Sequence, residues 1–200
     1  MPINLNDPRV RKTRRSLQNA FIQLIMKQGY DSISIQDIAN EAETARITFY
    51  RHYKDKEELL TDCLNALYDE LVEKTEAAIH AGAPRTATPL RTFYEHLDEK
   101  EDLYRVLFSG MGSYTVISRM TTYMVEKTRG ELKRLALTPS SIPLDICAYH
   151  LVSANIGLGV WWLENGKPHT IDYMTQRSLT LSLQGIAHIF NGGDVTTLIP

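Results

Sequence analysis

TARITFYRHYKDKEELL, which spans residues 44–60, contains three aromatic side chains, one histidine and four basic residues beside an acidic run. On a helix that turns 100° per residue, Phe49, Tyr53 and Ala45 fall on one face and can enter a small core. The residues on the opposite face and its flanks are polar, basic or β-branched: Ile47, Thr48, Tyr50 and Arg51. The stretch therefore predicts a short helix with one buried side and one side that faces an external partner.

Two helices are predicted before this stretch. Asp7-Pro8 is typical of an N-cap followed by the first helical position, and Gly29 is a suitable helix terminator. Ser34 with Asp37 forms a capping-box pattern, which predicts a short helix over residues 35–42. A third helix then runs from residue 44 or 45 to residue 53. A longer helix followed by two short ones is the plan of a helix-turn-helix motif.

The rest of the chain also has a helical pattern. Asp55 caps a long helix that ends near Gly82, and residues 82–89 form the best linker in the chain. Further helices are predicted near residues 89–100, 101–109, 113–136, 143–165 and 170–191. No segment has the period-2 alternation of a strand, so we predict an all-α fold of about nine helices. Gly157 and Gly159 lie inside one of these helices, where they favour close helix approach over phosphate binding.

The outward face of residues 44–56 suits DNA, because the second short helix of such a motif lies in the major groove. Arginine bridges guanine, threonine bonds a base edge or touches a thymine methyl, and tyrosine reaches phosphate. Lys56 begins the next helix, whose N-terminus also favours phosphate, and His52 fits a phosphate donor and a boundary residue equally well. The residues predicted to contact DNA are Arg11, Lys12, Arg14, Ser34, Thr44, Arg46, Ile47, Thr48, Tyr50, Arg51, His52 and Lys56.

Charge is unevenly distributed along the chain. The 200 residues have a formal net charge of -2, yet residues 1–30 carry six basic side chains against Asp7 alone. A positive patch on an acidic body predicts local attraction to phosphate. An ordinary surface helix would explain the charges of residues 44–56, but not the capping box and the basic first helix beside them.

The segment DSISIQDIANEAETARITFYRHYKDKEELL, residues 31–60, resembles the DNA-binding signature of the TetR family of transcriptional regulators. DPRVRKTRRSLQNAFIQLI, residues 7–25, is similar to the first helix of that family, so the resemblance covers roughly residues 8–62. The chain departs from the family at the turn, where Glu43 stands in place of a common glycine and predicts a less tight connection. Because Ala45 cannot cap a helix, Thr44 is expected to be the N-cap. Ile47 replaces a smaller residue, which predicts a changed base preference.

The resemblance implies a helix-turn-helix domain over residues 1–55 and a helical effector-binding and dimerisation domain over residues 56–200. It implies a homodimer that binds a palindromic operator and responds to a small-molecule effector, most often as a repressor. The dimer interface is expected on residues 143–165 and 170–191. Two apolar stripes are predicted there: Ile146, Tyr149, Ser153, Ile156, Val160 and Leu163 on one helix, and Met174, Leu181, Gly185 and Ile189 on the other. Aromatic character and polarity suggest an effector pocket made by Tyr104, Phe108, Tyr123, His150 and Trp161.

Several classes of function lack support in the sequence. Cys63 and Cys147 are far apart and have no CxxC partner, which argues against a disulfide framework or a zinc site. No signal peptide and no apolar run of membrane-spanning length is evident, so we expect a cytoplasmic protein without a membrane partner. No metal, no cofactor and no enzymatic activity is expected, although an all-α enzyme with an accessory helix-turn-helix motif remains an alternative. WWLENGKP, residues 161–168, resembles a TetR-like subgroup with a coactivator member, so the helical body could instead bind a protein.

Overall fold

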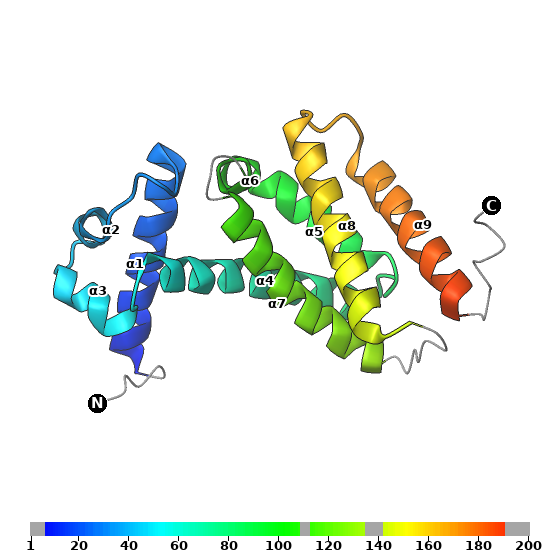
Figure 1. Ribbon diagram of the computed structural model, residues 1–200, viewed down its shortest axis with the longest axis horizontal. Helices are drawn as coiled ribbons and strands as arrows, with labels where there is room; N and C mark the ends of the chain where they lie inside the picture. The colour runs from blue at the N-terminus through cyan, green and yellow to red at the C-terminus, as the bar shows by residue number, and fades with distance from the viewer. Residues whose placement is uncertain (1–6, 109–112, 135–141, 191–200) are drawn as a thin grey trace. The chain divides into compact units, whose positions relative to one another are not determined.

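The structure is a computed structural model that describes residues 7–108, 113–134 and 142–190, and every element in these ranges is a helix. The predicted all-α fold of about nine helices is confirmed, and no described residue lies in a strand (Figure 1). In chain order the helices are α1 (Pro8–Gln28), α2 (Ile35–Glu41), α3 (Arg46–His52), α4 (Lys56–His80), α5 (Thr88–Glu99), α6 (Glu101–Phe108), α7 (Ser113–Arg134), α8 (Leu144–Glu164) and α9 (Ile171–Phe190).

The helices pack into two compact units. The first contains the chain up to Leu67 together with residues 100–119, and the second contains residues 68–99 and the chain from Met120 onward. Helices α4 and α7 therefore contribute to both units. This grouping describes packing; the functional division between residues 1–55 and 56–200 stays a prediction.

The first unit is built on α1, which packs against α2 and α6, while α2 packs against α3. Its core contains fully buried side chains from four of its helices: Leu17, Phe21, Ile38, Phe49 and Leu59. The predicted caps are present, since Asp7 accepts from the Arg9 amide and Ser34 forms a complete capping box with Asp37. Cys63 is a free, buried thiol of this core, and burial raises its pKa to about 12. Local signals therefore fix where α1 and α2 begin.

The turn between α2 and α3 is tight, which corrects the expectation of a looser connection. Glu43 adopts a left-handed backbone with φ 51°. Its amide donates to the Asn40 carbonyl at 3.0 Å, and the Thr44 amide donates to the Ala39 carbonyl at 2.9 Å. These two bonds are the Schellman motif that normally places glycine where Glu43 stands. Hydrogen bonding therefore imposes the glycine-like geometry on a residue with a Cβ.

The start of α3 also differs from the prediction. Ala45, not Thr44, occupies the N-cap position, and no side-chain hydrogen bond caps the helix. Ala45 is exposed instead of packing beside Phe49, because it precedes the helix and the 100° rotation does not apply to it. The first turn of α3 therefore depends on the preceding turn for its position.

Replacing Glu43 by glycine is expected to stabilise the protein by about 1 kcal/mol, since a left-handed residue with a Cβ costs roughly 1–2 kcal/mol. For a chain of this size the melting temperature should rise by roughly 2–4 °C, which differential scanning calorimetry would detect. The end of α8 provides an internal precedent, because Gly166 occupies the same Schellman position with φ 71°. Asn40→Gly, inside α2, is the matched control and should destabilise; an equal or lower melting temperature for Glu43→Gly would contradict the assignment of strain.

The second unit is organised by mutual packing of α5, α8 and α9. Gly159 of α8 lies so close to α5 that a Cβ there would sit 2.8 Å from side-chain atoms of Phe93 and Leu97. A Cβ added to Gly157, by contrast, would meet no atom within 4 Å. The predicted role in close helix approach is therefore confirmed for Gly159, and for Gly157 it stays a prediction.

Helix α8 is long and apolar enough to cross a membrane when judged by length and composition alone. The sequence pattern did not predict this. One side of α8 is buried against its own unit through Ala148, Val152 and Trp162, as in the core helix of a helical domain. Trp162 also stacks edge-on against Tyr94, whose hydroxyl lies 2.7 Å from the Ser178 hydroxyl. These contacts account for the buried side of the helix.

Candidate nucleic-acid interface

Helix α3 has one buried side and one exposed side. Phe49 and Tyr53 are 0% and 2% exposed, as the helical angles predict. On the other side Ile47 is 72% exposed, and Arg51 is exposed as well. Thr48 is half-buried on the flank. The helix is therefore held from within while a mixed apolar and basic surface points outward.

Arg46 and Tyr50 form a pair on the exposed part of α3. The Arg46 guanidinium donates to the Tyr50 hydroxyl at 3.2 Å and lies 5.5 Å from the centre of the Tyr50 ring. Residues four positions apart on a helix are neighbours, so this pair needs no support from another element. Tyr50 holds Arg46 along the surface of the helix, close to where DNA is predicted to lie.

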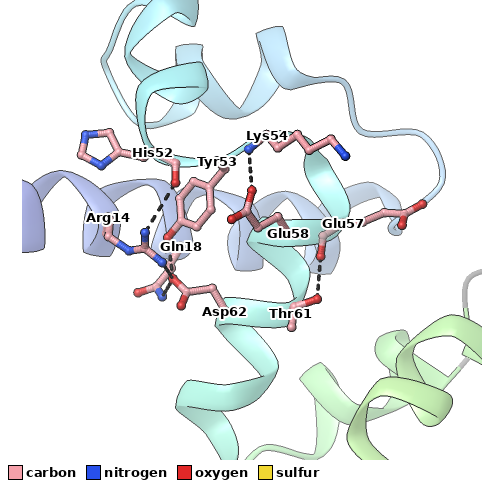
Figure 2. A network of polar contacts seen from close by, with 9 residues as sticks. All are labelled: Arg14, Gln18, His52, Tyr53, Lys54, Glu57, Glu58, Thr61 and Asp62. Atoms are coloured by element: carbon pink, nitrogen blue, oxygen red, sulfur yellow. Dashed lines mark hydrogen bonds and ion pairs between the residues drawn. The ribbon is translucent and has the colours of Figure 1, made fainter. Parts of the chain in front are cut away.

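A network of polar contacts at the C-terminal end of α3 converges on Asp62 of α4. Figure 2 shows Arg14, Gln18 and Tyr53 directed at this carboxylate. Asp62 Oδ2 lies 2.9 Å from the Arg14 guanidinium, accepts from Gln18 Nε2 at 2.7 Å, and accepts from the Tyr53 hydroxyl at 2.5 Å. Burial, followed by this hydrogen bond, raises the pKa of Tyr53 above its ordinary value. The network joins α1, α4 and the end of α3.

Arg14 has an internal role in this network. Its guanidinium also donates to the His52 carbonyl at 3.4 Å and lies 4.5 Å from the centre of the Tyr53 ring. The last carbonyls of a helix lack intrahelical donors and carry partial negative charge, so a cation at this end stabilises α3. A DNA contact by Arg14 stays a prediction, and the geometry gives its side chain a separate role in holding the end of α3.

Lys56 is likewise engaged inside the protein. Its ammonium donates to the Tyr30 and Ile33 carbonyls, both at 2.9 Å, and lies 4.3 Å from the centre of the Tyr30 ring. Burial lowers the pKa of Lys56 below its ordinary value. These contacts tie the start of α4 to the loop between α1 and α2. A phosphate role for Lys56 stays a prediction, and the geometry gives it a separate role in positioning the motif.

The remaining predicted DNA contacts occupy different environments. Arg11 and Lys12 are exposed on α1, and Thr44 is half-buried in the turn. The Ser34 hydroxyl is used by the capping box, where it bonds Asp37. His52 is half-buried, and its Nδ1 is buried without a hydrogen-bond partner among the described residues.

The charge state of His52 follows from its surroundings. Burial, followed by the positive charges of Arg14 and Arg51, lowers the pKa of His52 below its ordinary value. The imidazole is therefore neutral at pH 7. A phosphate placed beside the ring would favour the protonated form, so the two interpretations of His52, phosphate donor and boundary residue, both stay predictions.

A contact that the sequence did not predict lies behind the motif. Arg119 of α7 donates to the Thr61 hydroxyl at 2.6 Å and to the Glu57 carboxylate at 3.0 Å. Both partners lie in the first two turns of α4. The contact ties α7 to the beginning of the helix that follows α3. No local pattern could indicate it, because 58 residues separate Arg119 from Thr61.

The five residues suggested for an effector pocket lie in both packing units and in different local environments. Tyr104 and Phe108 are buried beside each other on α6, with ring centres 5.4 Å apart. Tyr123 is half-buried on α7 and donates to Asp69 at 2.9 Å. His150 and Trp161 are both exposed on α8, and they lie about 16 Å apart along its axis. An effector pocket made by these five residues therefore stays a prediction.

Two regions of the chain match known families. Residues 19–63 match the bacterial regulatory proteins of the tetR family, and residues 88–184 match a transcriptional regulator C-terminal region. A relative from Haemophilus influenzae, named an uncharacterized HTH-type transcriptional regulator, is 31% identical over 100 residues. That match covers 48% of this chain and 49% of the relative, so the similarity spans about half the length of the curated protein.

Solved structures resemble the chain over most of its length. A TetR transcriptional regulator from Streptococcus agalactiae is 25% identical with a TM-score of 0.66, and the match covers 89% of this chain and 97% of that one. The transcriptional repressor FadR of Thermus thermophilus, solved in complex with lauroyl-CoA, is 18% identical with a TM-score of 0.64 over 86% and 94% of the chains. The fatty acid degradation regulator FadR of Bacillus halodurans is 14% identical with a TM-score of 0.63 over 86% and 98%.

At 18% and 14% identity, the similarities to the two FadR structures concern the fold alone. The match over residues 19–63, the match over residues 88–184 and the helical fold shared with the Streptococcus agalactiae regulator all indicate the same family. This chain therefore belongs to the TetR family of DNA-binding transcriptional regulators.

Proposed function

We propose that the chain is a homodimeric repressor that binds a palindromic operator in the cytoplasm and is released by a small-molecule effector. The observation that carries the DNA-binding part is the division of α3 into a buried side, with Phe49 and Tyr53, and an outward side, with Ile47 and Arg51. One short helix makes few base contacts, each worth roughly 1–3 kcal/mol. Two copies on a two-fold axis double the contacts and require a symmetric site.

The exposed side of α8 supports the proposed dimer. Large apolar side chains are exposed on it, with Ile146 and Tyr149 at 58% and Trp161 at 42%. Ala154 and Gly157 lie between them and are exposed too. An apolar, small-residue face of this length is typical of a surface that another helix covers.

The predicted stripes coincide with this face only in part. Ile156 and Leu163 are 3% and 1% exposed, so they belong to the interior of the protomer. On α9, Met174 is buried and Leu181 is 66% exposed. The burial of Gly185 and Ile189 lies outside the described part of the chain. The proposed interface is therefore the exposed side of α8 together with Leu181.

Binding to DNA is tested by selecting sequences from a random library and by titrating the DNA upstream of the gene in a gel-shift experiment. We expect a palindromic consensus and an affinity that falls steeply as salt rises, because phosphate contacts release counterions. Absence of an enriched sequence, or binding that is insensitive to salt, would contradict the proposed function.

The effector is tested by a thermal-shift screen of metabolites that includes lauroyl-CoA, the ligand of the Thermus thermophilus structure. A compound that raises the melting temperature and also weakens operator binding supports a small-molecule effector, because it must bind one state better than the other. Co-purification of a protein that weakens operator binding, with no active compound, would favour the alternative of a partner protein.

Arg51→Ala is expected to reduce sequence preference. Arg51 is exposed on the outward side of α3, where a guanidinium can bridge a guanine. We expect about a tenfold or greater loss on the selected operator and little loss on random DNA. Arg15→Ala, an exposed arginine of α1, removes the same charge and should weaken both DNAs alike. Equal losses on both DNAs for Arg51→Ala would contradict a base contact.

A further inference from the structure

Ile47 is the most exposed large aliphatic side chain among the described residues, at 72%. An apolar side chain stabilises the fold when its surface is buried in the core. Ile47 is too exposed to contribute in this way. A β-branched residue also favours a helix less than alanine does. The fold therefore gains nothing from isoleucine at this position, and an external contact is the remaining physical reason for it.

The neighbours of Ile47 restrict what that contact is. Arg51 follows four residues later on the same line of the helix, and Arg46 precedes it directly. One apolar side chain beside two arginines is too small an apolar area for the centre of a stable protein-binding surface. It does match the major groove, where phosphates and guanines attract arginine and one base presents an apolar group.

We propose that Ile47 reads the C5 methyl group of a thymine in the operator half-site. The proposal rests on the proposed function, since it names the base that α3 contacts. Isoleucine has no donor or acceptor in its side chain, so it cannot discriminate bases by hydrogen bonds. In the major groove only thymine carries a methyl group, and apolar contact with that methyl is a recognised mode of direct readout.

The size of the effect follows from the area of one methyl group. Burying a methyl-sized group contributes enough to change affinity by about three- to fivefold. In a symmetric operator the contact occurs twice, so removing both methyls should weaken binding by roughly tenfold or more. An effect of this size is measurable by fluorescence anisotropy with labelled operator.

The experiment begins with the operator selected by the full-length dimer. Each thymine of the half-site is replaced in turn by deoxyuridine, which lacks only the methyl group, and affinities are measured for the wild type and for Ile47→Ala. We expect one thymine whose replacement weakens the wild type and has no effect on Ile47→Ala. At that position 5-methylcytosine should be tolerated better than cytosine, because it restores the methyl.

The control variant is Met26→Ala, which removes an exposed apolar side chain of α1, and it should retain the wild-type response to deoxyuridine. Ile47→Ala should fold normally because the side chain is exposed, and circular dichroism checks this. If every thymine tolerates deoxyuridine, or if the methyl effect persists in Ile47→Ala, the proposal is wrong while operator binding stands. If the selection yields no operator, the proposed function itself fails.

Discussion

Replacing Gly157 by arginine is expected to convert the proposed dimer into a monomer and to weaken operator binding by about 10²–10⁴-fold, the usual gain from joining two binding modules. Gly157 lies on the exposed side of α8, and a Cβ added there would meet no described atom of its own chain within 4 Å. Its backbone is helical, so arginine fits the folded protomer and favours the helix more than glycine does. The new side chain only obstructs a second copy.

Sedimentation velocity gives the oligomeric state, and a titration of labelled operator gives the affinity. Gly130→Arg is the matched control. Gly130 is an exposed glycine of α7, and a Cβ added there would also meet no described atom within 4 Å. Gly130→Arg should stay dimeric and melt no lower than the wild type. Gly157→Arg should stay folded by circular dichroism but lose the dimer and the stability that dimerisation adds. A Gly157→Arg protein that remains dimeric would place the interface elsewhere.

The starts of α1, α2 and α4 are predictable from the sequence because their signals are local. Asp7 caps α1 and Ser34 caps α2 within two or three residues of their own positions. Asp55 accepts from the Glu58 amide at 2.8 Å and starts α4 in the same way. Glu43 shows the limit of local signals: two backbone bonds determine its conformation against the preference of its side chain.

Contacts between distant segments were not predictable. Asp62 bonds Gln18 across 44 residues, and nothing in the spacing of either residue indicates this. The apolar stripe predicted on α8 mixes exposed and buried residues for a different reason. A stripe that repeats every 3.5 residues drifts by about 20° per heptad around a straight helix. The predicted stripe therefore begins on the exposed side, at Ile146, and ends on the buried side, at Leu163.

Asp62→Asn is expected to lower both the free energy of unfolding and the affinity for DNA. The carboxylate accepts from three donors, and hydrogen bonds to a charged group contribute about 1.5–3 kcal/mol each and are not additive. All three donors contact Oδ2, so the asparagine amide oxygen can still accept from them, but it carries no negative charge and each bond is weaker. We expect a loss of about 2 kcal/mol in urea unfolding.

Asp69→Asn is the matched control for stability, because Asp69 lies on the same helix and accepts from Tyr123. This substitution should lower the free energy of unfolding by well under 1 kcal/mol, because exposed contacts contribute little to stability. Tyr53→Phe, which removes only the hydroxyl that bonds Asp62, should fall between the two variants. A cost for Asp62→Asn no greater than that for Asp69→Asn would mean that the network does not stabilise the motif.

The effect of Asp62→Asn on DNA affinity separates positioning from simple electrostatics. Removing a negative charge near the predicted interface should, by attraction to phosphate alone, strengthen binding to every sequence. A weaker network should instead weaken binding, because Arg14 and Tyr53, which contact the end of α3, are then held less firmly. We expect weaker binding to the selected operator at a temperature where the variant is fully folded by circular dichroism. Tighter binding to operator and random DNA alike would show that Asp62 acts through its charge and does not position α3.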